Sequence, residues 1–113
     1  MLAKTHRLAK NSDVTRVVRA GRSFFSPMFI IKFVRGSTAP RFTVVVSTKV
    51  SKLAVVRNRI KRVLREYVRL RLQGFVLGDY MIIVRTQAAK LPAEELRGSL
   101  DAVFKRSGLI KNI

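Results

Sequence analysis

The feature that most constrains the fold is a segment beginning at Ala54 in which apolar and cationic residues repeat with a helical period. Successive side chains of an α-helix are turned by about 100°, so residues three or four apart share a face. One face of the predicted helix is apolar and holds Val56, Ile60, Val63, Leu64 and Tyr67. The far face holds Asn58, Lys61, Arg62, Arg65 and Arg69, with Arg57 and Arg59 at the two edges. The pattern therefore predicts a helix that packs on a core and offers guanidinium groups to phosphates.

The charge of the whole chain also indicates an anionic partner. Its 24 Lys and Arg outnumber its 6 Asp and Glu, which gives a formal charge of +18 on 113 residues. This density of like charge opposes a compact state and favours association with a polyanion. We therefore expect nucleic acid as the partner, with an anionic membrane surface as the chief alternative.

A membrane location is the weaker of these two alternatives. No run approaches the roughly 20 apolar residues that span a bilayer, and residues 1–10 contain too few apolar residues for a signal peptide. The chain has no Cys, which fits a reducing compartment. We expect a cytoplasmic protein with no membrane partner. Its hydrophobic content of 48% is ample for a core, and its length predicts a single domain over residues 1–113.

Other segments predict two further helices and a sheet. Ser12 is an expected N-cap for a short helix that ends at Gly21, where a glycine can adopt positive φ. Residues 28–35, 42–48 and 79–85 are rich in aromatic and β-branched residues, as strands are, and alternation of side chains along 42–48 places Phe42, Val44 and Val46 on one face. Residues 36–40 are an expected turn. Pro92, two acids, a helical apolar period and Gly108 predict a final helix. The expected order is α-β-β-α-β-α, in the α+β class.

The basic segment contains Arg57-Asn58-Arg59, continued by Ile60-Lys61-Arg62 and Arg65-Glu66. With this motif the chain resembles the bacterial ribonuclease P protein subunit, and the resemblance extends over nearly its whole length. Residues 8–21, 22–26, 47–49 and 79–85 are similar to further segments of that family, with a possible extra short strand near 22–26. The resemblance implies an α/β sandwich of the ribosomal protein S5 domain 2-like kind, with a left-handed βαβ crossover. The general handedness rule would instead give a right-handed crossover.

The resemblance also implies a function. It implies a monomeric protein that forms a one-to-one complex with a catalytic ribonuclease P RNA, which holds the Mg²⁺ and cleaves precursor tRNA. The protein would assist removal of the 5′ leader, which lies in a central cleft. The expected RNA-binding residues are Arg57, Asn58, Arg59, Lys61, Arg62, Arg65, Arg69, Lys49 and Lys52. The expected cleft residues are Phe24, Phe25, Lys32, Ser47, Arg85, Val14 and Val18, with core packing expected for at least one of the two phenylalanines.

Several positions depart from the family pattern. Val14 and Val18 stand where the family has aromatic residues, so stacking on a leader base is lost there. Thr43 and Ser51 stand where glycine is expected, and Thr48 replaces a lysine. The path of the chain into the basic helix is therefore expected to differ.

Catalysis by the polypeptide itself is not expected. Two-metal phosphodiester cleavage needs clustered carboxylates, whereas the six acids are scattered except for the pair Glu94 and Glu95. His6, the lone histidine, lies in a polar terminus without fixed geometry for a general base. A ribosomal or other structural RNA-binding protein remains an alternative. A sequence-specific DNA-binding helix is a second alternative, although only Asn58 is suited to reading bases.

Overall fold

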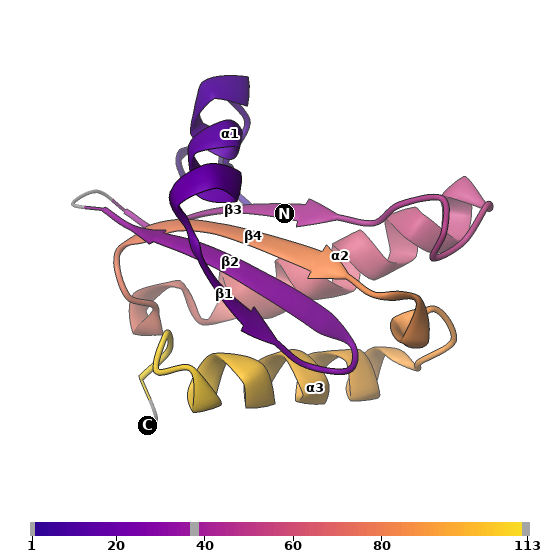
Figure 1. Cartoon of the computed structure of the whole chain (residues 1–113). Helices are drawn as coiled ribbons and strands as arrows, with labels where there is room; N and C mark the ends of the chain where they lie inside the picture. Colours follow the sequence, from indigo (N-terminus) through magenta and orange to yellow (C-terminus); the bar gives the residue numbers. More distant parts are fainter. Residues whose placement is uncertain (1, 37–38, 112–113) are drawn as a thin grey trace.

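A computed structural model of the chain describes residues 2–36 and 39–111, and contains one four-stranded sheet with three helices (Figure 1). The strands lie in the order β1-β2-β4-β3. The elements are η1 (Lys4–His6), α1 (Asn11–Ala20), β1 (Arg22–Phe25), β2 (Phe29–Arg35), β3 (Arg41–Val45), α2 (Ala54–Leu70), η2 (Leu72–Gly74), β4 (Gly78–Val84), η3 (Thr86–Ala88) and α3 (Ala93–Arg106).

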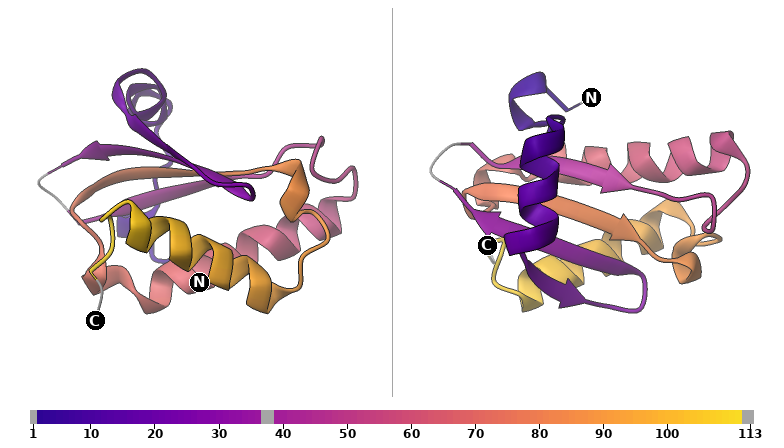
Figure 2. Two further views of the ribbon diagram at one scale, coloured as in Figure 1. Left: turned by 60° about the horizontal axis from the view of Figure 1, so that its bottom comes forward. Right: turned by 45° about the horizontal axis from the view of Figure 1, so that its top comes forward.

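The helices lie on both faces of the sheet. Helices α2 and α3 cover one face, which we call the inner face, while α1 crosses the other, outer face (Figures 1 and 2). Strands β3 and β4 are parallel neighbours joined through α2. Seen from the α1 side with both strands pointing right, β4 lies below β3 and α2 lies behind them (Figure 2, right). The crossover is therefore left-handed. The α+β sandwich, the short strand β1 and this crossover are confirmed.

The main core lies between the inner face and the helices α2 and α3. Alternate strand residues such as Phe29, Ile31 and Ile82 are fully buried there. Tyr80 is at its centre, with its ring close to the rings of Phe33, Phe42, Phe75 and Phe104. Each fully buried side chain of this kind contributes about 1.5–3 kcal/mol through the hydrophobic effect. The inner face therefore supplies most of the stabilising burial.

A second and smaller core lies between the outer face and α1. Its buried members are Leu8, Val17 and Met81, and Val14, Val34 and Ile83 pack against them. Two adjacent valines of α1 differ in burial, because Val17 is buried while Val18, an expected cleft residue, is 49% exposed. Helix α1 is held by few apolar contacts and leaves part of the outer face uncovered.

The ends of α1 differ from the prediction in their chemistry. Ser12 is not the N-cap, because the helix begins at Asn11 and its N-cap is Lys10. The Val14 amide donates to the Lys10 carbonyl at 3.0 Å. Gly21 ends the helix as predicted, but its φ is −71° and not positive. Glycine is required there by close packing, since a Cβ at Gly21 would lie 2.3 Å from the Val17 carbonyl oxygen.

Strand β3 ends earlier than the predicted range of 42–48. Pairing with β4 stops at Val45, and the chain then turns, with the Val50 amide donating to the Ser47 carbonyl at 3.1 Å. The predicted alternation is nevertheless confirmed, since Phe42, Val44 and Val46 are buried. Of the expected turn at 36–40, residues 37 and 38 lie outside the described residues.

Candidate RNA-binding surface

Helix α2 presents the two faces that its period predicts. Ile60, Leu64 and Tyr67 are fully buried against the core, and Val56 and Val63 pack beside them. Asn58, Arg62, Arg65 and Arg69 are exposed on the opposite side. The helix begins at Ala54, as predicted, and continues to Leu70. Its amphipathic period thus explains both why it docks on the sheet and why its cations face solvent.

The two arginines at the edges of this face turn in opposite directions. The Nη1 of Arg57 donates to the Ser51 carbonyl at 2.9 Å, which holds the loop between β3 and α2. The Nη2 of Arg59 donates to the Leu91 carbonyl at 3.0 Å, next to the start of α3. Both side chains are half-buried, so each has a structural bond in addition to N–H groups that remain for an anion.

The remaining cations of α2 differ in their partners. Arg69 forms an ion pair with Glu66, which lowers the pKa of that carboxyl through their hydrogen bond. In the part of the chain that the structure describes, no acidic side chain pairs with Arg62 or Arg65. Among the arginines of α2, Arg62 and Arg65 therefore have the guanidinium groups most available to bind an anion. Lys49 and Lys52 are exposed in the preceding loop, and Lys61 is half-buried.

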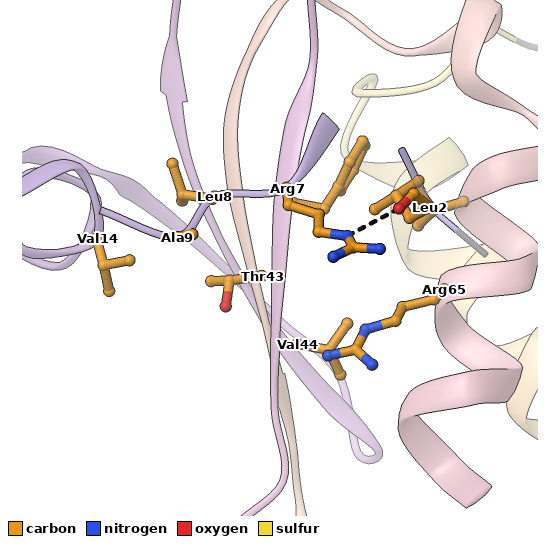
Figure 3. A pocket seen from close by; sticks show the side chains of 10 residues that line it. Leu2, Arg7, Leu8, Ala9, Val14, Thr43, Val44 and Arg65 are labelled. Carbon is orange, nitrogen blue, oxygen red and sulfur yellow. Dashed lines mark hydrogen bonds between the residues drawn. The ribbon is translucent and has the colours of Figure 1, made fainter. Parts of the chain in front are cut away.

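A pocket of about 450 Å³ opens where strand β3 forms the edge of the sheet (Figure 3). Arg7 and Arg65 lie on one side of the strand, with Val14 and Thr43 on the other. The N-terminal segment reaches this edge because the Leu8 amide donates to the Phe42 carbonyl at 2.8 Å. The pocket therefore joins the cationic side of α2 to the outer face of the sheet.

Arg7 also belongs to this surface, although it was not expected from the sequence. Its Nε donates to the Leu2 carbonyl at 2.8 Å, which directs the guanidinium toward α2 (Figure 3). Residues 4–10 contain several cations but no helical or strand period, so no signal in the sequence distinguishes Arg7 from its neighbours. Its position depends on the isolated bridge between Arg7 and Phe42.

The outer face brings several expected cleft residues together. Strand pairing places Ser23, Lys32, Met81 and Thr43 in one row across the sheet, and Phe25, Ile30, Ile83 and Val45 in the next. Lys32 donates to the Ser23 hydroxyl at 3.1 Å, and Phe25 is 62% exposed. An exposed aromatic ring thus lies near a cation on an open sheet face, a combination that binds single-stranded nucleic acid.

The other expected cleft residues are more dispersed. Phe24 packs against the main core on the inner face, which confirms the expectation that at least one of the two phenylalanines is a core residue. Val45 of β3 pairs with Ile83 of β4. Ser47 and Arg85 lie two residues further along these parallel strands, so both leave the sheet at the same end. Arg85 also donates to the Ser26 carbonyl at 3.1 Å, which ties it to the turn between β1 and β2.

An ion cluster connects α1 to the outer face and was not foreseen. Asp79 is 3% exposed and accepts hydrogen bonds from Nε and Nη2 of Arg41, both at 2.8 Å, and from Arg16 of α1. Arg41 also donates to Asp13 of α1 at 3.2 Å. The hydrogen bond from Arg41 to Asp79 raises the pKa of the arginine. We call Asp13, Arg16, Arg41 and Asp79 the outer-face ion cluster.

Two further groups of residues bear on the expected chemistry. Within residues 2–36 and 39–111, no three His, Cys, Asp or Glu side chains come close enough to hold a metal ion. A hydrogen bond of 2.8 Å joins Nδ1 of the lone histidine, His6, to the Pro40 carbonyl.

None of the described helices is long and apolar enough to cross a membrane.

Known proteins share both the sequence and the fold. The family model described as Ribonuclease P matches residues 2–108. The ribonuclease P protein component of Bacillus cereus strain AH187 is 37% identical over 111 residues, covering 96% of each chain. That of Xanthomonas euvesicatoria is 35% identical over 107 residues, covering 95% of this chain and 74% of its own length.

Solved structures agree with these sequence relatives. The Staphylococcus aureus RNase P protein superposes with a TM-score of 0.89 at 27% identity, over 96% of this chain and all of that one. The Thermotoga maritima RNase P protein gives 0.79 at 25% identity, over 94% and 98% of the two chains. The chain therefore belongs to the bacterial ribonuclease P protein family.

Proposed function

We propose that this chain is the protein subunit of ribonuclease P, which binds the catalytic RNA and the 5′ leader of precursor tRNA and assists removal of that leader. The observation that carries the proposal is the solvent side of α2, where Arg62 and Arg65 lie beside Asn58 and pair with no acidic side chain among the residues that the structure describes. Family membership adds the identity of the RNA partner. The chain acts as one RNA-binding domain, a monomer in a one-to-one complex located in the cytoplasm.

The catalytic RNA docks on the solvent side of α2. Guanidinium groups bind phosphate oxygens in bidentate fashion and stay charged at physiological pH. Arg62 and Arg65 supply most of this affinity, while Arg57 and Arg59 add phosphate contacts and fix the loops at Ser51 and Leu91. Lys49, Lys52, Lys61 and Arg69 extend the surface. Each neutralised phosphate releases a condensed counterion, so binding weakens steeply as salt rises.

The 5′ leader crosses the outer face beside α1. Phe25 offers its ring to a base, and Lys32 offers its ammonium to a phosphate. Arg85 and Ser47 lie where the strands end, so they extend the path at that end of the sheet. Val18 is exposed on α1 and Val14 lines the β3-edge pocket, and both give only apolar contact. The pocket, with Arg7 and Arg65, makes the two surfaces continuous.

The chemistry of cleavage belongs to the RNA. Without three clustered acidic or histidine ligands in its described residues, the chain offers no cage for a pair of metal ions, and the Mg²⁺ is held mainly by the RNA. The protein's contribution is to neutralise phosphate repulsion between two RNAs and to hold the leader. We expect the polypeptide alone to cleave nothing.

The salt dependence of binding to the catalytic RNA tests this proposal. In an Arg62→Ala, Arg65→Ala variant the log–log slope of affinity against salt should flatten by about two units, one per lost phosphate contact. The matched control is Arg97→Ala, Lys111→Ala, which removes the same charge from exposed positions on and after α3. Equal slopes for the two variants would contradict docking through α2.

The RNA that copurifies with the protein separates the proposal from its alternative. A single species of a few hundred nucleotides is expected for ribonuclease P. Ribosomal RNA would instead indicate a structural RNA-binding protein without associated cleavage.

A further inference from the structure

We propose that Asp79 is a positioning residue for the leader: through the outer-face ion cluster it fixes α1 on the sheet and so sets the wall of the leader path. The inference rests on the proposed function, because it assigns a role within the same RNA-binding surface. It concerns a residue that contacts no RNA in the proposal and acts through Arg16 and Arg41.

The burial of Asp79 requires its partners. A carboxylate that is 3% exposed has lost its water, and such a charge is strongly destabilising unless ion pairs and hydrogen bonds compensate it. Arg41 supplies two hydrogen bonds from the same sheet, and Arg16 supplies a third from α1. The carboxylate can therefore be satisfied fully only when α1 occupies its present place.

The cluster joins α1 to the sheet through acidic and basic side chains of both elements. Helix α1 contributes one acid and one base, Asp13 and Arg16, while the sheet contributes Asp79 and Arg41. The two acids and two bases balance, so the cluster adds no net charge to the surface. Its geometry is directional, because Arg41 binds Asp79 with two parallel hydrogen bonds.

Few other contacts determine the orientation of α1. Only Val17 of this helix is fully buried, and it packs in the small cluster with Leu8 and Met81. An apolar contact of this size allows a helix to tilt, because it is not directional. The ion cluster therefore supplies the orientation. The position of α1 over the sheet (Figure 2) decides how much of the outer face, which carries Lys32 and Phe25, stays open.

The variant that tests this is Asp79→Asn, with Glu66→Gln as its matched control. Both remove one negative charge, but Asp79 pairs with Arg16 and Arg41 in the outer-face ion cluster, whereas Glu66 lies on α2 and pairs with Arg69 at an exposed site. A pure charge effect would change RNA binding equally in both variants. A positioning effect appears only in Asp79→Asn.

The measurement is the ratio of affinities of the assembled enzyme for precursor tRNA and for mature tRNA. In Asp79→Asn this preference should fall by about fivefold or more, the range of an ordinary coupling between sites, while affinity for the catalytic RNA is retained. Glu66→Gln should keep the full preference. A full preference in Asp79→Asn would overturn the inference. The proposed function fails differently, since the wild-type enzyme would then show no preference at all.

The position of α1 can be measured independently of binding. The chain has no Cys, so spin labels placed through Thr15→Cys on α1 and Glu94→Cys on α3 report a single distance. We expect a narrow distribution in the wild type and in Glu66→Gln, and a shifted or broadened one in Asp79→Asn. A lost preference with an unchanged distance would contradict positioning.

A second variant tests the same inference if Asp79→Asn does not fold. Arg16→Gln removes one of the two ties from α1, and it leaves the bond from Arg41 to Asp13 and the paired hydrogen bonds between Arg41 and Asp79 intact. Arg16 is 47% exposed and Arg41 still pairs with the buried carboxylate, so we expect this variant to fold. It should broaden the same distance distribution and lower the preference in the same direction. An unchanged preference and distance in Arg16→Gln would overturn the inference.

Discussion

On the inner face of the sheet, two helices bury Phe29, Ile31 and Tyr80 completely, whereas on the outer face a single ten-residue helix covers only part of the surface. The inner face is closed by apolar packing, and the outer face by the small cluster around Val17 together with the outer-face ion cluster. The difference indicates a division of work. The inner face supplies stability, and the outer face leaves exposed the surface that we propose for leader binding.

Helix α2 takes part in both sides of this division. Ile60 and Leu64 anchor it to the inner face, while Arg62 and Arg65 face solvent. A helix docked this firmly fixes the backbone positions from which its cations project, which is expected to reduce the entropy lost when the proposed RNA binds. Substitutions can therefore be chosen that affect stability and binding separately.

The largest expected effect is on stability at the inner face. Phe29→Ala should lower the free energy of unfolding by about 3–5 kcal/mol, because it leaves a cavity in the main core. On the outer face, Val17→Ala should cost about 1–2 kcal/mol, since the smaller side chain is lost from a cluster that can collapse around it. Urea unfolding measures both. Equal losses would contradict the division between the faces.

A smaller effect on stability is expected at Gly21, where the chain passes from α1 to β1. A Cβ at residue 21 would lie 2.3 Å from the Val17 carbonyl oxygen and 3.3 Å from that of Phe33. Gly21→Ala must therefore shift α1 or β1, at a cost of about 1–3 kcal/mol. The control is Gly98→Ala within α3, where a Cβ meets nothing within 4 Å. It should stabilise the protein by about 0.5–1 kcal/mol, and a loss of stability there would contradict this account of the helices.

The contact between α2 and α3 should make stability depend on acid pH. The hydroxyl of Tyr67 donates to Asp101 at 2.7 Å, and Lys105 pairs with it at 2.8 Å. Burial opposes ionisation, but the hydrogen bonds from Lys105 and Tyr67 outweigh it and lower the pKa of Asp101. Burial, followed by the hydrogen bond to Asp101, raises the pKa of Tyr67.

The sign of the pH effect follows from the lowered pKa. The stability that ionised Asp101 contributes is complete above its unfolded pKa of about 3.9 and is lost as pH falls through the lower folded value. Asp101→Asn should therefore cost about 1 kcal/mol at pH 7 and progressively less below about pH 4. Unfolding measured at both pH values checks this, and a difference independent of pH would contradict it.

The smallest effect on stability is expected at the leader path. In a Lys32→Ala, Phe25→Ala variant, both changes fall on the open outer face, so the free energy of unfolding should stay within about 0.5 kcal/mol. The preference of the assembled enzyme for precursor over mature tRNA should nevertheless fall markedly. An unchanged preference would remove these residues from the leader path.

Local periodicity in the sequence predicts much of this architecture. The two faces of α2 and the alternation in β3 and β4 follow from spacing alone, because each residue's environment repeats with the geometry of its element. The end of β3 at Val45 does not follow, because it depends on where pairing with β4 stops. The left-handed crossover runs against the general rule and was expected only from the family resemblance.

The candidate surface was less accessible to sequence reasoning. Asp79 reads as a single acid at the start of a strand, yet in three dimensions it meets arginines 38 and 63 positions away along the chain. Arg7 reaches α2 only through pairing between the N-terminal segment and β3. Such contacts depend on the assembled topology. The structure places the expected RNA-binding residues, but their contacts with RNA remain predictions.

Cleavage of precursor tRNA at low and high Mg²⁺, by protein alone, RNA alone and both together, tests the central claim most directly. Phosphate repulsion between two RNAs can be offset by a protein of charge +18 or by added ions, which screen it over about 10 Å or less. We predict no cleavage by the protein alone, cleavage by the RNA alone only at high Mg²⁺, and cleavage by both at low Mg²⁺. Cleavage by RNA-free protein, or no benefit from the protein at low Mg²⁺, would contradict the account.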